Sequence, residues 1–277
     1  MPIPVTEFSL LEQTAFLTAY ARALDNRTDV PILGDELSDR VVGLIDYDFA
    51  AFRIPASVVR QTALRAKMLD DRVRTFTSTN PDAVVVDLGA GLNEPMVRVA
   101  PPAGVDWYSI DLPHVIALRE KLLTAPDGEH LVAADLTSGD WIAGIPVGRP
   151  TMVIADGLFA FLTEAQVIAL FGQIIDRVGT GELAFNDYGR VGVLSSLGMK
   201  LAPRGMFTVL RQVWANPGFS DPRTPQRWDP RLRLVEQACL AHAAEVDSFP
   251  SAARLVTRLA GRFKSVAGKA RVLRYKF

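Results

Sequence analysis

The sequence is poor in the residues that usually form cross-links, metal sites and acid–base centres. Its 277 residues include one cysteine, Cys239, and three histidines. A single cysteine excludes a disulfide framework within the chain and a cysteine zinc site. The histidines, His114, His130 and His242, lack the spacing of metal ligands. We therefore expect no metal, and we expect surface or capping roles for the histidines rather than catalysis.

Long apolar runs and a basic leader are also missing. The longest apolar stretch, residues 151–162, is interrupted by Asp156 and is too short to span a bilayer. The N-terminus carries Glu7 and Glu12, and no basic segment precedes an apolar run as in a signal peptide. We expect no association with a membrane and a cytoplasmic location.

The net charge of −1 conceals an uneven distribution. Residues 190–277 hold 16 Lys and Arg against 5 Asp and Glu, whereas residues 1–189 hold 14 against 26. A basic C-terminal third is typical either of a site for an anionic ligand or of a segment that docks on an acidic remainder. Both interpretations stay open. The basic residues are interleaved with prolines and apolar residues and form no tract, which disfavours nucleic acid as a partner.

Residues 83–96, AVVVDLGAGLNEPM, predict a buried strand followed by a ligand-binding loop. Gly89 and Gly91 lack side chains that would keep a ligand away from the backbone. A dinucleotide fingerprint would have a third glycine where this chain has Glu94. Asp87 suits a cofactor with positive charge, such as the ammonium and sulfonium of S-adenosylmethionine. This segment therefore favours S-adenosylmethionine over NAD, and a plain glycine turn is the alternative.

Aspartates also end the apolar segments that follow. Asp111 lies 24 residues after Asp87, a distance typical of a strand–helix–strand unit. A carboxylate at the end of that second strand can bind both hydroxyls of a ribose. Three more apolar segments, 131–136, 151–156 and 181–187, carry Asp135, Asp156 and Asp187 at or near their ends. Because ligands of open α/β sheets bind outside the carboxyl ends of the strands, we expect these acids to surround one site, with Asp135 near an adenine amine.

The remaining pattern predicts the organisation of the chain. Helical spacing of apolar residues at 6–26, 36–45 and 55–76 places three helices ahead of the first strand, as a cover over residues 1–80. Residues 81–277 form the expected core. Within it, the Gly-, Pro- and aromatic-rich stretch 189–228 predicts a lid or substrate cap.

Beyond residue 228 the pattern predicts a helix over 230–243, a strand over 244–249, a helix over 250–259 and a last strand over 270–277. Seven strands with intervening helices indicate an α/β fold with the Rossmann-like sheet of class I S-adenosylmethionine-dependent methyltransferases. The strand order is inferred by analogy with that class.

Several motifs resemble the leucine carboxyl methyltransferase family over most of the chain, within the branch of the tetracenomycin-pathway (polyketide) carboxyl O-methyltransferase. These motifs are PILGDELSDRVVGLIDYDF (31–49), VVVDLGAGLNEP (84–95), WYSIDLPHVIALRE (107–120), IADGLFAFL (154–162) and RVLRYKF (271–277). Together they are far more specific than the glycine loop alone.

The resemblance implies which residues bind S-adenosylmethionine. Arg65 would pair with its carboxylate, Asp156 (usually Glu in the family) would face it, and the other matching positions are Gly89, Gly91, Asp111, Asp135 and Leu136. We also expect Asp87 and Leu112 to bind the cofactor. The chain departs from the family at Asn93 and Glu94, where Asp and Thr are usual, and at Phe161, where Tyr is common. These departures bear on the substrate and the cofactor geometry rather than on the fold.

The sequence favours an O-methyltransferase that forms a methyl ester on a carboxylate of a small-molecule or peptide substrate. A carboxylate is ionised at neutral pH and needs no general base, which agrees with the scarcity of histidine. The substrate contacts that we expect are Phe161, Arg190, Arg204, Phe207, Arg211 and Trp214. One alternative is a phenol or hydroxyl acceptor, with Asp156, Asp187 or Tyr188 as the base. The other is a cofactor-binding protein that transfers no methyl group.

Overall fold

The structure is a computed structural model that describes residues 2–189 and 205–277. Its centre is a seven-stranded sheet with the order β5-β4-β3-β6-β7-β9-β8. The strands are β3 (Val84–Leu88), β4 (Asp106–Asp111), β5 (Glu129–Ala133), β6 (Thr151–Ala155), β7 (Glu182–Asp187), β8 (Arg233–Cys239) and β9 (Arg271–Lys276). The first five are parallel, and β9 runs antiparallel to its neighbours β7 and β8. The expected Rossmann-like sheet is confirmed.

The central strands form where the sequence is continuously apolar. Every residue of β3, β6 and β7 is buried, as expected for parallel strands covered on both faces. The ends of these strands differ from the predicted ends by at most a few residues. A short parallel pair, β1 (Ile3–Pro4) with β2 (Ile45–Asp46), forms a separate two-stranded sheet that the sequence did not predict.

The prediction was wrong between residues 230 and 249. The expected helix over 230–243 is the edge strand β8, and the expected strand over 244–249 is a 3₁₀ turn, Ala244–Ser248. Residues 233–239 contain good helix formers, yet their alternating exposure matches a strand. Pairing with β9 decides the outcome, because tertiary context overrides a weak local preference.

The helices cover both faces of the sheet and its carboxyl edge. They are α1 (Gln13–Asn26), α2 (Glu36–Leu44), α3 (Ala56–Thr79), α4 (Pro95–Val99), α5 (Pro113–Leu122), α6 (Glu164–Val178), α8 (Met206–Val213), α9 (Pro225–Trp228), α10 (Ser251–Gly261) and α11 (Lys264–Ala267). Helix α3 packs on one face and α6 on the other. Among the described residues, no helix combines the length and the hydropathy needed to cross a bilayer.

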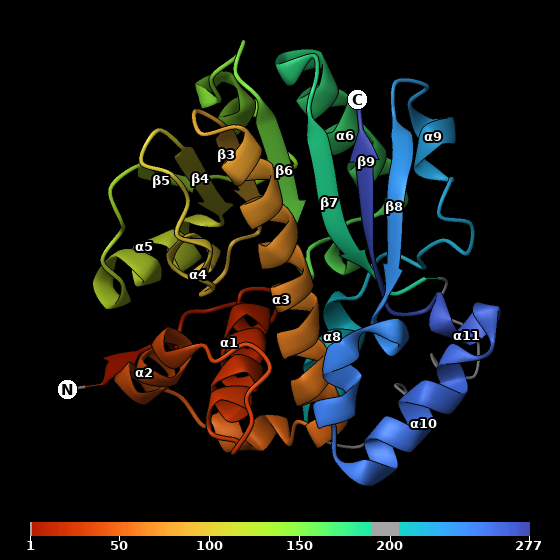
Figure 1. Cartoon of the computed structure of the whole chain (residues 1–277). Coiled ribbons are helices and arrows are strands. Elements are labelled where there is room, and N and C mark those ends of the chain that lie inside the picture. The colour runs from red at the N-terminus through yellow and green to blue at the C-terminus, as the bar shows by residue number, and fades with distance from the viewer. Residues whose placement is uncertain (1, 190–204) are drawn as a thin grey trace.

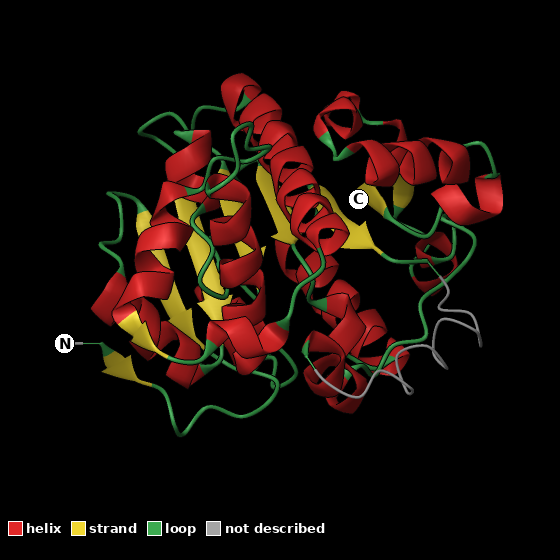
Figure 2. Cartoon of the chain, turned by 90° about the horizontal axis from the view of Figure 1, so that it is seen from below, coloured by secondary structure: helices red, strands yellow, loops and turns green. Residues whose placement is uncertain are grey.

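A third apolar core lies beyond the carboxyl ends of the strands. It joins α1, α2 and α8 to α5 and to the loop after β3. Figure 1 shows α1 and α8 below the arrowheads of the strands, and in Figure 2, seen from below, helices lie in front of the sheet. Segments from both ends of the chain therefore close this edge of the sheet.

Buried ion pairs tie the N-terminal helices to the loop after β3. The Arg22 guanidinium, on α1, lies 2.9 Å from the Asp35 carboxylate and donates a hydrogen bond to the carbonyl of Leu92. Arg98, on α4, bridges Asp35 and Asp70 at 3.2 and 2.7 Å. Each charge has an opposite partner, which offsets the cost of taking it out of water.

Part of the basic C-terminal third docks on the acidic remainder of the chain. Arg271 lies 2.7 Å from Asp187, and Arg274 lies 2.7 Å from Glu182. Arg231 in turn lies 2.8 Å from Asp176. For these residues the docking interpretation of the charge asymmetry is confirmed.

Two arginines of the α1 region provide a matched test of buried against exposed charge. The Arg22–Asp35 side chains are 1% and 2% exposed, whereas the Arg27–Asp39 pair is 46% and 33% exposed. We expect Arg22→Met to lower the free energy of unfolding by about 3 kcal/mol, because it leaves Asp35 with less compensation. Arg27→Met should cost less than about 1 kcal/mol. Urea unfolding measures both, and similar effects of the two substitutions would contradict this account.

Candidate functional site

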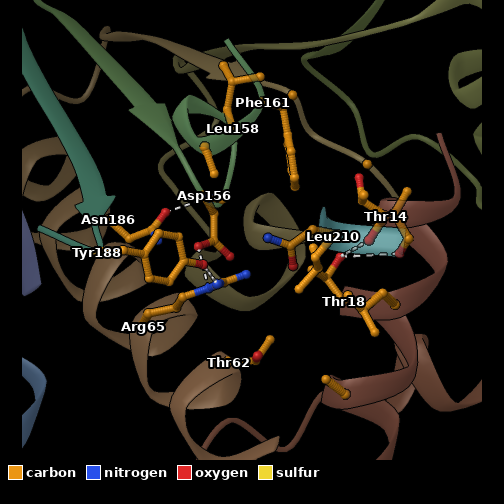
Figure 3. Close-up of a pocket in the computed structure, with 18 of the residues that line it drawn as sticks. Thr14, Thr18, Thr62, Arg65, Asp156, Leu158, Phe161, Asn186, Tyr188 and Leu210 are labelled. Carbon is orange, nitrogen blue, oxygen red and sulfur yellow. Dashed lines mark hydrogen bonds and ion pairs between the residues drawn. The ribbon is translucent and has the colours of Figure 1, made fainter. Parts of the chain in front are cut away.

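A cavity of about 680 Å³ lies at the carboxyl ends of the parallel strands. Helices α1, α3 and α8 form its other walls, and residues from the turn ahead of β9 complete it. Figure 3 shows side chains from these separate elements pointing toward one space. This is the edge at which ligands bind in open α/β sheets.

The cavity brings together most of the residues that the sequence singled out. Lining it are Arg65, Asp87, Gly89, Gly91, Asp111, Leu112, Asp135, Leu136, Asp156, Phe161, Tyr188, Phe207 and Trp214. Arg190 and Arg204 lie outside the described residues. Arg211 is exposed on α8 and is not among the lining residues.

The loop after β3 has a backbone that only glycine adopts readily. Gly89 has φ +67° and Gly91 has φ +56°. A Cβ atom at Gly89 would lie 3.1 Å from a methyl carbon of Leu158, which also lines the cavity. The loop therefore needs glycine both for its conformation and for the space beside it.

One buried guanidinium holds this loop. Arg119, on α5, donates to the carbonyls of Gly91 and Asn93, at 2.9 and 2.7 Å. It also contacts the carboxylates of Glu94 and Glu129, at 2.6 and 2.9 Å. Burial raises the pKa of Glu94 to about 7, against the opposing effect of Arg119. Glu94, where the family usually has Thr, therefore forms an ion pair with Arg119. Neither residue is among those that line the cavity.

Asp87 is the carboxylate in the cavity that most needs a cationic partner. Its side chain is buried, and one of its oxygens, Oδ2, has no hydrogen-bond partner among the described residues. Burial raises its pKa to about 8, although Arg119 opposes the shift. A bound cation would compensate this charge. The residues present therefore fit a ligand with an ammonium group, as in S-adenosylmethionine.

Asp111 joins the loop to the end of β4. Its carboxylate oxygens accept the N–H groups of Gly91 and Leu112, each at 2.7 Å. Each oxygen retains further acceptor capacity, as ribose hydroxyls would require. Asp135 is exposed at the rim, where its carboxylate accepts hydrogen bonds from the backbone and hydroxyl of Thr137.

Arg65, Asp156 and Tyr188 form one cluster in the cavity (Figure 3). The Arg65 Nε atom lies 2.8 Å from Asp156 Oδ1, and its Nη1 donates to the Tyr188 hydroxyl. Burial alone would lower the pKa of Arg65, but Asp156 and Tyr188 together outweigh this effect and raise the pKa. Burial raises the pKa of Tyr188, so its phenol stays neutral at neutral pH. Both predicted catalytic candidates therefore contact the arginine predicted for the cofactor.

Sequence reasoning missed several polar lining residues: Thr14, Thr18, Arg22, Gln61, Thr62, Asn186 and Lys269. The sequence did contain a signal for those on α1. Thr14, Thr18 and Arg22 are spaced four residues apart and therefore share a helix face. Gln61 and Arg65 have the same spacing on α3. No local pattern marks Lys269, which reaches the cavity from a turn near the C-terminus.

Comparison with known proteins gives a consistent result. The model of the leucine carboxyl methyltransferase family matches residues 15–175. The O-methyltransferase TcmP of tetracenomycin polyketide synthesis from Streptomyces glaucescens is 34% identical over 229 residues, 82% of each chain. The S-adenosyl-L-methionine-dependent methyltransferase dpfgK from Gibberella zeae is 28% identical over 251 residues, 83% of each chain.

A solved structure shows the same fold at low sequence identity. The S-adenosylmethionine-dependent methyltransferase from Anabaena variabilis superimposes with a TM-score of 0.53 at 12% identity. The match covers 76% of this chain and 83% of that one. At this identity the likeness supports the fold alone.

We expect Asp87 to make cofactor binding depend on pH. Its pKa of about 8 means that a cation binds with release of a proton at neutral pH. We expect affinity for S-adenosylhomocysteine to rise as the pH increases toward about 8 in the wild type, and Asp87→Asn to weaken binding by about 1.5–3 kcal/mol. Calorimetry in buffers of different ionisation enthalpy measures both the affinity and the proton release.

The variant also supplies its own folding control. Because Asp87→Asn removes a buried charge, the unliganded variant should unfold at no lower temperature than the wild type at pH above about 8. If S-adenosylhomocysteine released as many protons on binding to Asp87→Asn as on binding to the wild type, Asp87 would not be the group that ionises on binding.

Arg65 should be sensitive to a conservative change. Its guanidinium reaches Asp156 and Tyr188 at once, and a lysine ammonium cannot reproduce that fork. We expect Arg65→Lys and Arg65→Ala both to weaken S-adenosylhomocysteine binding, each by more than about 1 kcal/mol. Arg72→Lys, on the same helix but paired with Glu236 away from the cavity, is the control. Unchanged affinity in both Arg65 variants would mean that Arg65 has only a structural role.

Proposed function

The chain belongs to the leucine carboxyl methyltransferase family, and we propose that it methylates a carboxylate oxygen of a small, largely apolar acid. It is an S-adenosylmethionine-dependent methyltransferase, as its relatives are. When bound, the sulfonium supplies a methyl group that an acceptor oxygen attacks as the carbon–sulfur bond breaks, and the thioether keeps the electron pair.

The observation that carries the choice of acceptor is that the two aspartates predicted as bases are already paired with arginines. No histidine is present among the described lining residues. Asp156 is paired with Arg65, and Asp187 is paired with Arg271. Tyr188 would have to lose its phenol proton to act as a base, and burial opposes this loss because it raises the pKa of Tyr188. A carboxylate acceptor is already ionised and places no demand on any of these groups.

The apolar wall of the cavity supports an acceptor with an apolar body. It is made by apolar side chains from α8, α3 and the segments around them, namely Ile54, Val58, Phe161, Met206, Phe207, Leu210 and Trp214. The cavity volume of about 680 Å³ is in the range of small-molecule sites. We therefore favour a small-molecule acid over a peptide.

The two parts of the cavity have different proposed roles. Residues at the strand ends would hold the cofactor: Asp87 the ammonium, Asp111 and Leu112 the ribose, Asp135 and Leu136 the adenine. Arg65 would hold its carboxylate. Residues 1–80 would act as a cover over the core of residues 81–277. Of the predicted lid over 189–228, α8 lines the cavity, and residues 190–204 lie outside the described chain.

A probe with two acceptors on one ring system tests the proposal. A hydroxynaphthoic acid, which carries both a carboxylate and a hydroxyl group, is incubated with the enzyme and with S-adenosylmethionine labelled in its methyl group. We expect label that is released by mild base, since a methyl ester hydrolyses and an aryl ether does not. Base-stable label would establish a hydroxyl acceptor, and binding without any label would leave only a cofactor-binding protein.

The pH dependence of the rate gives an independent check. At saturating cofactor, where ionisation of Asp87 no longer limits binding, kcat should be flat between about pH 6 and 9. A hydroxyl acceptor would give a rising limb in this range, because its base must lose a proton first. Such a limb in kcat would contradict the carboxylate proposal.

A further inference from the structure

We propose that Lys269 binds the carboxylate of the acceptor, an inference that rests on the proposed function. Lys269 lies in the turn that leads into β9, and it lines the cavity. It is exposed, and its ammonium has no ion pair or hydrogen bond with the described residues. A lysine carries three donors on a flexible stem, which suits capture of an anion at the rim of a site.

The other cations that line the described cavity are already committed. Arg22 is paired with Asp35 and bonded to the carbonyl of Leu92. Arg65 is paired with Asp156 and bonded to Tyr188.

Arg271 is also committed to partners of its own. It is paired with Asp187 at 2.7 Å, and its other nitrogens donate to the carbonyls of Phe219 and Ser220. Among the described lining residues, Lys269 is therefore the cation whose charge is not already matched by a carboxylate.

An anionic acceptor needs such a cation because carboxylates outnumber the cations that line the described cavity. Six carboxylates line it: Glu12, Asp87, Asp111, Asp135, Asp156 and Asp187. A second anion brought near these groups is repelled unless a positive charge lies on its path. Lys269 supplies such a charge on the lining of the cavity, from a turn beside the segment that follows β7.

The position of Lys269 is set by a close approach of two backbones. Gly189 follows Tyr188 and has φ +59°. A Cβ atom there would lie 2.8 Å from the carbonyl oxygen of Gly268 and 3.2 Å from the Cα of Lys269. The turn that carries Lys269 thus packs directly on the segment that carries Tyr188, and only glycine permits this spacing.

One ammonium contact is compatible with the reaction. A carboxylate has two oxygens, so Lys269 can bind one while the other attacks the methyl carbon. The product ester is neutral and loses the attraction to Lys269. The same contact that selects the acid therefore favours release of the ester.

The test compares an acid with its own ester. Naphthoate and methyl naphthoate are titrated against protein saturated with S-adenosylhomocysteine, in the wild type, in Lys269→Met and in Lys269→Arg. We expect Lys269→Met to weaken naphthoate binding roughly tenfold, the loss of a hydrogen bond to a charged group. Binding of the ester should not change, and Lys269→Arg should retain most of the affinity for the acid.

A charge-matched control separates a local contact from a general field. Lys121, exposed on α5 and not among the lining residues, carries the same charge, so Lys121→Met should leave both affinities unchanged. Affinity for S-adenosylhomocysteine should be the same in all variants. The wild-type preference for acid over ester should weaken with ionic strength, and Lys269→Met should show little of this dependence.

Several outcomes would overturn the assignment: no binding of naphthoate to the wild type, an equal loss of acid and ester in Lys269→Met, or no loss of either. The proposed function is judged separately, by the base-labile product from a hydroxynaphthoic acid. If the wild type forms the ester and Lys269→Met forms it with an unchanged KM, the function stands and the role of Lys269 falls. If no ester is formed, the function itself falls.

Discussion

The site depends on the hydrogen bonds that one buried arginine makes to the loop after β3. Arg119 binds the carbonyls of that loop and is itself balanced by two buried carboxylates, Glu94 and Glu129. The loop can then present Gly89 and Gly91 with positive φ angles. With the loop fixed, Asp111 reaches its backbone N–H, and Arg22 reaches its carbonyl at Leu92. The strand ends, the loop and the N-terminal cover thus share one set of interactions.

Charge is distributed unequally around the cavity, and this inequality gives its two parts different chemistry. Asp87 remains uncompensated and favours a cationic ligand. The carboxylates farther along the sheet edge are neutralised by arginines from α3 and β9. The cavity therefore has an acidic part around Asp87 beside an apolar part with few free ionisable groups. Such a cavity is well suited to an acceptor that arrives already ionised.

The sequence predicted those features that depend on local pattern. Continuous apolar runs identified the parallel strands, and the aspartates that end them correctly indicated where the cavity lies. Local pattern failed at β8, because an edge strand with helix-forming residues is defined by its partner β9. It also could not predict that Glu94 pairs with Arg119, or that Arg65 contacts Tyr188 from 123 residues away. Long-range pairs of charged side chains leave no periodic trace in a sequence. The residues that bind cofactor and acceptor remain predictions.

The apolar wall that α8 contributes to the cavity has a consequence for how relatives of this chain diverge. Its α8 side chains, Met206, Phe207 and Leu210, belong to the third apolar core and not to the two cores that sandwich the sheet. Replacing them alters the shape of the wall while the strands keep their packing. Substitutions on this helix can therefore change the shape of the cavity while the two cores that sandwich the sheet stay intact. One inherited sheet can in this way serve a lineage of enzymes with unrelated substrates.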